Sequence, residues 1–439
     1  MFASVPLLPK SAEDYRKIVG DQVIDDLIKL AEPFRDARVL HFNATAFGGG
    51  VAELLNGIVP LMQNLGLAAD WQVMRGSDEF YTVTKAMHNA LQGAFVNIDS
   101  SMREIYLRYN QLNADLWDES YDFVVIHDPQ PAPIHAMLRE RSGPAGGCWL
   151  WRCHIDLTAA QPDVWDFLRP YVEAYDAAIF TIPQYVKNDL HIGNIAIIPP
   201  SIDPLSPKNY DLPDTTISVV TKQFGIDRTR PIIIQVSRFD PWKDPLGVID
   251  TYRIVKCEFP EVQLVMVASM AHDDPEGWSY YERTARHAGD DYDIFLLSNL
   301  NGVGNVEVNA LQRAASVVLQ KSLREGFGLT VAEALWKRKP VVASNVGGIP
   351  TQVIQGQTGF LVNSVGEAAA RIIELLKNPE LMAKLGEAGH QHVLRHFLTT
   401  ATVKRYLELF TRMRQSMTDQ QPQAAPEQPA AAESSDPQR

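Results

Sequence analysis

Short, strongly apolar runs alternate along the chain with longer stretches in which apolar residues recur at helical spacing. In a parallel sheet covered on both faces, each strand reads as such a run and each covering helix as an amphipathic segment. The pattern therefore predicts an α/β protein. In the first half, strands are expected at residues 38–43, 71–74, 123–126, 149–153, 178–182 and 195–198. In the second half, they are expected at residues 231–237, 263–268, 294–297, 317–320 and 340–343.

A proline-rich segment separates the two halves of this pattern. Residues 199–207, Pro-Pro-Ser-Ile-Asp-Pro-Leu-Ser-Pro, contain four prolines, which suits a restrained crossover better than a strand or a helix. The 439 residues are also about twice the length at which a single core usually stops growing. We therefore predict two domains, residues 1–204 and 205–417, with the last helices free to cross back onto the first domain.

Each half is predicted to form a Rossmann-like, doubly wound domain. Such sheets bind ligands outside the carboxyl ends of their strands, so two of them facing each other enclose a central cleft. Residues 418–439 are rich in Pro, Ala, Gln and acidic residues and contain no aromatic side chain. This composition predicts a disordered tail.

Charge and targeting signals narrow the class of ligand. Acidic residues number 53 and basic residues 40, giving a net charge of −13, and no basic run is present to attract a phosphate backbone. The N-terminus has neither a basic start nor a long apolar stretch. We therefore expect no nucleic-acid or membrane partner and a cytoplasmic location.

Cys148, Cys153 and Cys257 have no metal-type or redox-type spacing and are expected to be free thiols.

A glycine-rich loop follows the first predicted strand. Residues 44–50, Ala-Thr-Ala-Phe-Gly-Gly-Gly, open a helical stretch at 51–65, whose N-terminal amides are expected to face an anion. The glycines do not match G-x-G-x-x-G, and Arg75 stands where a dinucleotide site has an acid. Dinucleotide binding is therefore disfavoured, and a turn whose glycines only permit close packing is the alternative.

Two cations, Arg238 and Lys243, lie in the loop after the strand at 231–237. A diphosphate gains negative charge as its bond to a sugar breaks, and fixed cations stabilise that state more than the ground state. Arg238 and Lys243 are thus candidate catalytic residues that need no metal. The alternative is a solvated loop in which they pair with Asp240 and Asp244.

Two carboxylates, Glu325 and Glu333, are separated by seven residues within 322–334, Ser-Leu-Arg-Glu-Gly-Phe-Gly-Leu-Thr-Val-Ala-Glu-Ala. If the segment is mostly helical, they lie roughly 12 Å apart. The acid and base of a glycosidase lie within roughly 5 to 9.5 Å, so the spacing favours transfer over hydrolysis. The alternative makes Glu325 a neighbour of a helix N-cap and Glu333 a solvated helix residue.

Together these loops resemble the family-four retaining glycosyltransferases, whose GT-B fold pairs two Rossmann-like domains and whose hallmark is Glu, seven residues, Glu. The resemblance implies that Glu325 bonds the donor sugar, Glu333 the ribose, and Arg238 and Lys243 the diphosphate, while residues 301–307 border the nucleobase. The implied donor site comprises Gly48, Gly49, Gly50, Arg238, Lys243, Asn301, Glu325, Gly326, Phe327, Gly328, Leu329 and Glu333.

Three further segments narrow the resemblance. Residues 41–45, His-Phe-Asn-Ala-Thr, 127–131, His-Asp-Pro-Gln-Pro, and 151–156, Trp-Arg-Cys-His-Ile-Asp, look like the trehalose-forming glycosyltransferring synthases and the related trehalose phosphorylases. Alternation along an extended segment also places the side chains of residues 152, 154 and 156 on one face. The resemblance implies an acceptor site of Asn43, His127, Asp128, Arg152, His154 and Asp156.

Within that site the resemblance places His154 against the reacting bond, so it is a fourth candidate catalytic residue beside Arg238, Lys243 and Glu325. The alternative is a satisfied structural histidine. Asp291-Tyr292-Asp293 superficially matches a metal-binding Asp-x-Asp but precedes a strand instead of ending one. It is interpreted as a solvated turn, so no metal site is expected.

The activity that the resemblance implies is a retaining glucosyltransferase, which forms α,α-trehalose reversibly from UDP-, ADP- or GDP-glucose and free glucose. No cofactor is expected to be obligatory, although Mg²⁺ can accompany the nucleotide sugar, and a homodimer is compatible with the sequence. Three alternatives stay open: a trehalose phosphorylase that uses inorganic phosphate, a sucrose-type synthase of the same family, and a two-lobed sugar-binding protein without catalysis.

Overall fold

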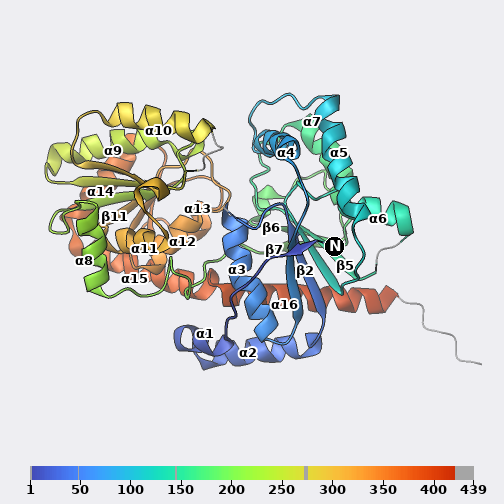
Figure 1. Ribbon diagram of the computed structural model, residues 1–439. Coiled ribbons are helices and arrows are strands. Elements are labelled where there is room, and N and C mark those ends of the chain that lie inside the picture. Colours follow the sequence, from blue (N-terminus) through green and yellow to red (C-terminus); the bar gives the residue numbers. More distant parts are fainter. Residues whose placement is uncertain (1, 48, 144–145, 271–274, 421–439) are drawn as a thin grey trace, which may run out of the picture.

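The structure is a computed structural model, and it describes residues 2–47, 49–143, 146–270 and 275–420. These residues form two α/β domains that lie side by side, as Figure 1 shows. Two predictions from the sequence fall outside them. Gly48 of the glycine-rich loop is one, and residues 421–439 of the predicted tail are the other.

The first domain contains a seven-stranded sheet in the order β1-β3-β2-β4-β5-β6-β7. Its strands run parallel except for β1, which is antiparallel to β3. Its elements are β1 (Ala3–Ser4), α1 (Ala12–Val19), α2 (Asp21–Ala31), β2 (Arg38–Asn43), α3 (Gly49–Asn64), β3 (Ala68–Val73), α4 (Asp78–Leu91), α5 (Ser100–Asp115), β4 (Phe123–His127), α6 (Ile134–Ser142), β5 (Cys148–Arg152), α7 (Pro162–Val172), β6 (Ala177–Phe180) and β7 (Ile195–Ile197).

The second domain contains a six-stranded parallel sheet in the order β10-β9-β8-β11-β12-β13. The helices and strands from residue 214 onward are α8 (Asp214–Gln223), β8 (Ile232–Val236), α9 (Pro245–Glu258), β9 (Gln263–Ala268), α10 (Pro275–Ala288), β10 (Ile294–Ser298), α11 (Asn305–Ala314), β11 (Val317–Gln320), α12 (Leu329–Trp336), β12 (Val341–Ser344), α13 (Ile349–Gln352), β13 (Gly359–Val362), α14 (Val365–Lys377), α15 (Pro379–His396) and α16 (Thr399–Gln420).

Each sheet is buried on both faces, which explains why its strands are apolar throughout. In β2, Leu40 and Phe42 join one buried cluster while Val39 joins the cluster on the other face. The strands of the second sheet divide in the same way between two further clusters. Burial on both faces fixes the register of every strand, because a slip of one residue would exchange the two sets of side chains.

The order of strands reverses once in each sheet, between β2 and β4 in the first domain and between β8 and β11 in the second. The second sheet thus has the 3-2-1-4-5-6 order of a Rossmann fold. At a reversal, the connections leave in opposite directions and open a crevice outside the carboxyl ends of the two strands. These two places are where functional residues are expected.

Two strands were missed by the hydrophobic pattern. β1 has only two residues, Ala3 and Ser4, too few for any periodicity. β13 begins at Gly359, where a Cβ atom would run into the carbonyl oxygen of Val341 on the neighbouring strand. Glycine is required by this close approach, yet in a sequence it reads as a turn.

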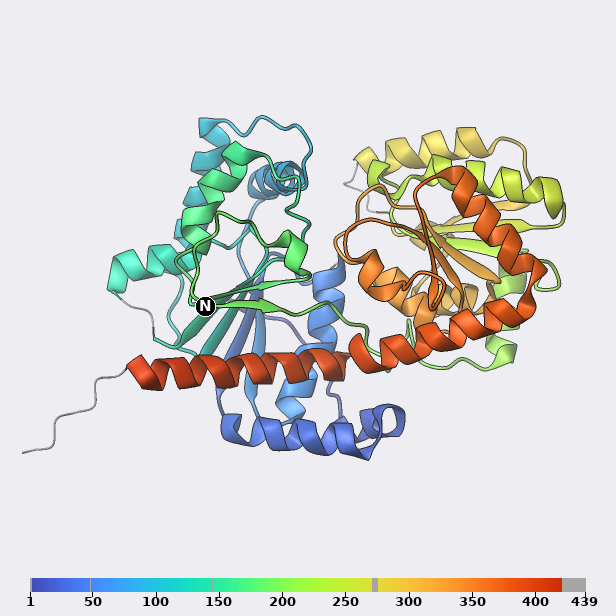
Figure 2. The same cartoon turned by 180° about the vertical axis from the view of Figure 1, so that it is seen from behind.

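The C-terminal helix α16 packs against the first domain, running below its sheet and above α1 and α2 in Figures 1 and 2. Phe410 stacks on Phe123 of β4, with ring centroids 4.1 Å apart and an interplanar angle of 19°. It also lies edge-on to Phe34 at 6.2 Å. The helix continues to Gln420, so the predicted start of the tail at residue 418 is too early.

The two passages of the chain between the domains lie side by side. The amide of Ile202 donates to the carbonyl of Phe397 at 2.8 Å, and the amide of Thr399 donates to the carbonyl of Ile202 at 3.0 Å. The proline-rich crossover is therefore paired with the start of α16, and each passage restrains the other.

We predict that Phe410→Ala destabilises the first domain by about 3 to 5 kcal/mol, because it removes a fully buried ring and leaves a cavity beside Phe123. Urea unfolding followed by tryptophan fluorescence measures the change. Lys404→Ala, at an exposed position of the same helix, is the control. Equal stability of the two variants would show that α16 does not stabilise the domain on which it lies.

Candidate functional site

Lys243 and Glu325 meet at the strand reversal of the second domain. Lys243 ends a short 3₁₀ helix, Pro241–Lys243, that follows β8, and Glu325 lies in the loop after β11. The Lys243 Nζ is 2.7 Å from the Glu325 Oε2, and both side chains are largely buried. Ser322 Oγ donates to the same carboxylate oxygen at 3.2 Å. The structure therefore brings these two predicted residues together beyond the carboxyl ends of the strands.

A second ion pair lies beside the first. Lys321 Nζ donates to Asp244 Oδ2 at 2.8 Å, and Gln235 of β8 accepts from the amide of Lys321 at 2.8 Å. Gln235 also donates to the carbonyl of Lys243 at 3.0 Å. One buried glutamine thus connects both loops, and its position directly below the site holds Lys243 and Glu325 at a fixed separation.

Arg238 is the exposed cation of this group. Its side chain is 65% exposed, and its guanidinium pairs with Asp240 at 3.0 Å. Burial and the charge of Arg238 lower the pKa of His88 to about 4. His88 lies on α4, so the charge of Arg238 acts on a residue of the first domain. The alternative in which the loop cations pair only with Asp240 and Asp244 is wrong for Lys243 and correct for Arg238.

The glycine-rich loop and the second glutamate segment lie against each other. α3 begins at Gly49 and α12 at Leu329, and a Cβ atom at Gly50 would lie 3.0 Å from Leu329 Cδ1. Gly328, with φ 85°, is the N-cap of α12. The N-termini of two helices, one from each domain, are thus adjacent. Each N-terminus offers unpaired amides and a partial positive charge to an anion.

Glu333 is buried in α12, so its interpretation as a solvated helix residue is wrong. The residue is 1% exposed. Its Oε1 is 3.3 Å from Lys208 Nζ, while its Oε2 is buried without a hydrogen-bond partner. Lys208 also bonds Glu53 Oε1 at 2.8 Å. Burial alone would lower the pKa of Lys208, but Glu333 and Glu53 raise it above its ordinary value.

The other residues of the predicted donor site lie in different environments. Phe327 packs in the core of the second domain at 5.4 Å from the ring of Phe397. Asn301 is exposed, and its side-chain oxygen accepts from Ser298 at the end of β10. α12 begins only at Leu329, so the estimate of about 12 Å between the carboxylates, which assumed a mostly helical segment, has no basis for residues 325–328.

Three histidines form a hydrogen-bonded row at the strand reversal of the first domain. His41 Nδ1 of β2 is 3.0 Å from His127 Nε2 of β4, and His127 Nδ1 is 2.9 Å from His154 Nε2, just beyond β5. Arg152 Nε donates to His154 Nε2 at 3.1 Å. The row crosses three neighbouring strands and ends at the side chain that the sequence places nearest the reaction.

The position of each proton in this row follows from Arg152, which can only donate. His154 Nε2 must accept from it, so His154 carries its proton on Nδ1. His127 Nδ1, which also faces that acceptor, must donate, and its Nε2 must accept from His41 Nδ1. The remaining nitrogen, His41 Nε2, is buried without a partner. With neutral rings, all three imidazoles therefore carry the proton on Nδ1, and the Nδ1–H of His154 is the donor that the row does not use.

Burial keeps the row uncharged. It lowers the pKa of His41 to about 3, with a smaller contribution from Arg152. Burial and the neighbouring histidine and arginine charges also hold the pKa values of His127 and His154 well below the usual range. His154 is therefore a neutral hydrogen-bond donor at physiological pH, not a general acid.

Asp128 fixes the backbone of His154. Its Oδ1 accepts from the amide of His154 at 2.8 Å, and its own backbone is left-handed, with φ 65°. Burial raises the pKa of Asp128 to about 7, against the opposing effects of the His154 amide and Arg152. A strained backbone and a displaced pKa in one residue are typical of functional sites.

Two residues of the predicted acceptor site have buried side chains that are hydrogen-bonded to other groups of the protein. Arg152 is 1% exposed and donates to Tyr406 OH at 2.7 Å and to the carbonyl of Ile198 at 3.1 Å. Asn43 bonds the indole of Trp71 and the carbonyl of Thr45. Both side chains are therefore hydrogen-bonded within the protein, and their contact with an acceptor stays a prediction.

Asp156 lies further along the same segment, and its carboxylate accepts from Thr158 in a turn. The predicted alternation therefore brings Arg152 and His154 into contact but not Asp156.

The acceptor and donor loops touch. A Cβ atom at Gly326 would lie 2.9 Å from the carbonyl oxygen of His154. Tyr185, which is buried in the first domain, places its hydroxyl 2.7 Å from the carbonyl of Gly326 and 3.0 Å from that of Glu325. His154 and Glu325 therefore belong to one site built from both domains.

Several of the residues that shape this site carry no sequence signal. Glu53, Lys208 and Tyr406 stand outside every motif, and only the tertiary structure brings them to the site. Gly347 does carry a sequence signal. Its φ of 55° and the closeness of the Glu325 carbonyl, into which a Cβ atom would run, both require glycine. The pair Gly347-Gly348 was a visible signal that the sequence reasoning did not use.

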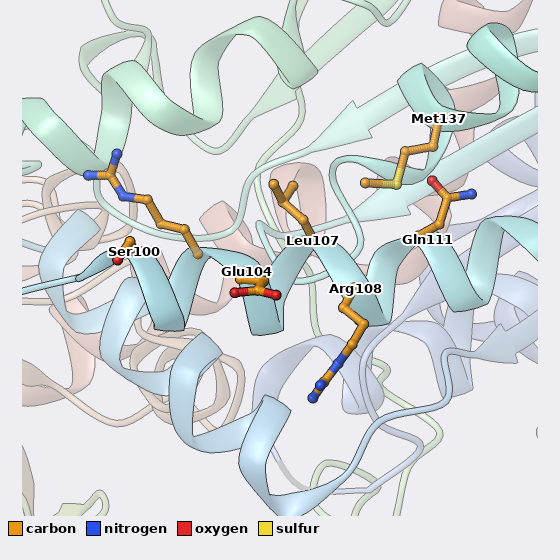
Figure 3. A pocket seen from close by; sticks show the side chains of 7 residues that line it. Ser100, Glu104, Leu107, Arg108, Gln111 and Met137 are labelled. Atoms are coloured by element: carbon orange, nitrogen blue, oxygen red, sulfur yellow. The ribbon is translucent and has the colours of Figure 1, made fainter.

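Two other features do not contribute to the site. Asp291 and Asp293 bond Lys256 at 2.7 and 3.0 Å, so the predicted solvated turn is an ion-pair network. A surface groove of about 530 Å³ lies over α5 and α6 (Figure 3), away from the candidate residues, and is lined by Ser100, Arg103, Glu104, Leu107, Arg108, Gln111 and Met137. None of the helices among the described residues is long and apolar enough to cross a membrane.

Comparison with known proteins agrees with this geometry. Residues 41–187 match a family model described as trehalose synthase, N-terminal domain, and residues 218–392 match glycosyl transferases group 1. A trehalose synthase of Rubrobacter xylanophilus is 51% identical over 92% of this chain and 97% of its own length. One from Pyrococcus furiosus is 48% identical over 91% of this chain and 96% of its own length. The chain belongs to the trehalose synthase family.

Members of the trehalose synthase family are glycosyltransferases, and the GT-B fold of this one is shared with more distant proteins. A trehalose-6-phosphate synthase from Burkholderia multivorans is 16% identical, with a TM-score of 0.68 over 89% of this chain and 99% of its own. A protein from E. coli whose structure holds UDP-2-fluoro glucose is 16% identical, with a TM-score of 0.66 over 88% of this chain and 99% of its own.

For this family member we predict that Asp128→Asn increases stability at neutral pH. The folded protein holds the Asp128 proton up to about pH 7, whereas an unfolded aspartate loses it near pH 3.9. Stability therefore falls as pH rises between these values, by at most roughly 4 kcal/mol. Asparagine tolerates the left-handed backbone and cannot ionise.

Urea unfolding from pH 5 to 8 should show the variant's advantage growing with pH. Asp36→Asn, at an exposed aspartate with φ 61°, controls for the backbone. An advantage that is independent of pH would contradict the assignment.

We also predict that His41, His127 and His154 stay neutral with the proton on Nδ1 from pH 8 down to pH 5. Two-dimensional NMR of ¹⁵N-labelled imidazoles distinguishes the two tautomers from the protonated ring. Single His→Gln variants provide the assignments. Protonation of any of the three in this range, or an Nε2–H tautomer at His154, would contradict the hydrogen-bond row described above.

Proposed function

We propose that the chain forms α,α-trehalose from a nucleoside-diphosphate glucose and free glucose, reversibly and with retention at the donor carbon. The observation that carries this proposal is the buried Glu333, whose Oε2 has no partner although it lies in the first turns of α12 beside an anion-binding helix terminus. A carboxylate with a free oxygen in that place suits a ribose whose two hydroxyls can donate to it.

The donor would lie with its diphosphate between the N-termini of α3 and α12. Arg238 and Lys243 would face the phosphates and stabilise the charge that develops on the leaving group. Glu325, held by Lys243 at 2.7 Å, would accept hydrogen bonds from the donor glucose. The nucleotide base would lie toward residues 301–307. UDP-, ADP- and GDP-glucose are the candidate donors.

The acceptor glucose would lie against His154 and Asp128. His154 would offer its Nδ1–H to a sugar oxygen beside the reacting bond, because the row beneath it fixes that tautomer. A neutral donor aligns the sugars without competing for the acceptor's proton.

That proton would pass to the departing phosphate oxygen on the same face of the donor, which explains retention without a covalent intermediate. We propose that no cofactor is obligatory, with Mg²⁺ accompanying the nucleotide sugar at most. A cytoplasmic location and a homodimer stay predictions.

A trehalose phosphorylase is the competing activity within the same site. A protein of that name from Grifola frondosa is 28% identical over 87% of this chain, which covers 58% of its length. A phosphorylase has no use for a ribose-binding carboxylate. The ion pair between Lys208 and the buried Glu333 therefore favours a nucleotide-dependent reaction over phosphorolysis. A sucrose-type synthase would use the same donor contact.

The activity is tested by incubating purified protein with each nucleoside-diphosphate glucose and either glucose or fructose, and separately with trehalose and inorganic phosphate. We expect nucleotide release and α,α-trehalose with glucose only. Turnover confined to phosphate and trehalose would instead identify a phosphorylase. Glucose binding without any turnover would identify a binding protein.

Glu333→Gln adds a second measurement to this experiment. Loss of the charge should weaken the contact with ribose and lower kcat/KM for the nucleotide sugar by about 10- to 100-fold. Glu261→Gln, at an exposed position just before the amino end of β9, is the control for loss of one negative charge in the same domain. Equal activities of the two variants would contradict a ribose contact at Glu333.

A further inference from the structure

Glu53, Lys208 and Glu333 form a row of charges that crosses the domain boundary. Glu53 is on α3 of the first domain, Glu333 is on α12 of the second, and Lys208 lies between them in the crossover segment. The Lys208 Nζ is 2.8 Å from Glu53 and 3.3 Å from Glu333. The Lys208 side chain is 17% exposed and that of Glu333 is 1% exposed, so solvent screens this contact weakly.

Lys208 belongs structurally to the second domain. The backbone on either side of it is bonded to α11 and α12: Asn309 donates to the carbonyls of Pro207 and Tyr210, and Trp336 Nε1 donates to the carbonyl of Asn209. These contacts place the Lys208 side chain against Glu333 whatever the first domain does. Its second contact, with Glu53, forms only when α3 lies where it does here.

The remaining oxygen of Glu333 has no partner. A buried carboxylate is stable as an anion only with a nearby cation and with hydrogen bonds to its oxygens. Lys208 supplies the cation on Oε1 and leaves Oε2 buried and unbonded. The carboxylate is therefore oriented by Lys208 and short of one donor, which is the condition that a ligand hydroxyl satisfies.

We propose that Lys208 is a positioning residue that orients Glu333 toward the ribose and, through Glu53, makes ribose recognition depend on the placement of the first domain. This inference rests on the proposed function. It adds a specificity-determining residue outside every sequence motif, and it links the donor site to the glycine-rich helix α3 by one shared cation.

The experiment measures kcat/KM of the full-length protein for the best of UDP-, ADP- and GDP-glucose and for the 2′,3′-dideoxyribose counterpart of that donor. The ratio of the two values reports contact with the ribose hydroxyls. We expect a wild-type ratio on the order of ten to a hundred. Lys208→Met should lower it about tenfold, and Lys208→Arg, which keeps the charge, should restore most of it.

Two further variants test the parts of the inference. Glu53→Gln should lower the ratio in the same direction by a smaller factor, about threefold, because the lysine keeps its contact with Glu333. In a Glu333→Gln background, Lys208→Met should have no further effect on the ratio, since the two residues act through one contact. Lys222→Met, at an exposed position on α8, is the matched control and should leave the ratio unchanged.

Four outcomes would overturn the proposal. If Lys208→Met lowers both values equally, Lys208 contacts the phosphates or only stabilises the fold. If Glu53→Gln leaves the ratio unchanged, the link to the first domain is absent. A wild-type ratio near one with good turnover overturns this inference alone. Absence of turnover with every nucleotide sugar overturns the proposed function with it.

Discussion

Two passages of chain, hydrogen-bonded to each other, set the relative position of the two domains, and everything between the domains depends on them. The crossover at Ile202 pairs with residues 397 and 399 at the start of α16, and Thr399 Oγ donates to the carbonyl of Ile202 at 3.2 Å. A single passage would leave a hinge free to rotate. Two paired passages, one of which continues into a helix packed on the first core, restrict that rotation.

The topology of each sheet then decides where chemistry can be placed. Residues that follow β8 and β11 meet because these strands are neighbours whose connections diverge, and this brings Lys243 to Glu325. The same reversal between β2 and β4 brings His41 to His127. Tyr185 of the first domain connects the two reversals, because its hydroxyl bonds the carbonyls of Glu325 and Gly326. The site is thus a consequence of two strand reversals facing each other.

The difference between contacts set by sheet topology and contacts between distant parts of the chain explains what could be predicted from the sequence. Buried strands such as β2, β9 and β11 have the predicted bounds, because burial on both faces makes their sequences apolar throughout. Lys243 and Glu325 could be expected at the same edge of the sheet because each lies in the loop that follows a buried strand, β8 or β11. The contact of Arg152 with Tyr406 joins residues 254 positions apart, and no local pattern encodes it. Lys208 was missed for the same reason, because the hydrogen bonds that position it join its neighbours in the chain to the distant helices α11 and α12.

The two halves of the site also differ in how they carry charge. The donor half holds fixed ions in pairs, such as Lys243 with Glu325 and Lys208 with Glu333, which suits a ligand that arrives as an anion. The acceptor half contains three neutral imidazoles above one cation, Arg152. Burial of the Arg152 guanidinium is offset by its hydrogen bonds to the Tyr406 hydroxyl and to a backbone carbonyl. The Nε–H of Arg152 remains, and it sets the tautomer of His154. Under the proposed function, a second cation facing the acceptor would attract the diphosphate and misplace it, so a neutral row is the arrangement that would let glucose bind beside a charged donor.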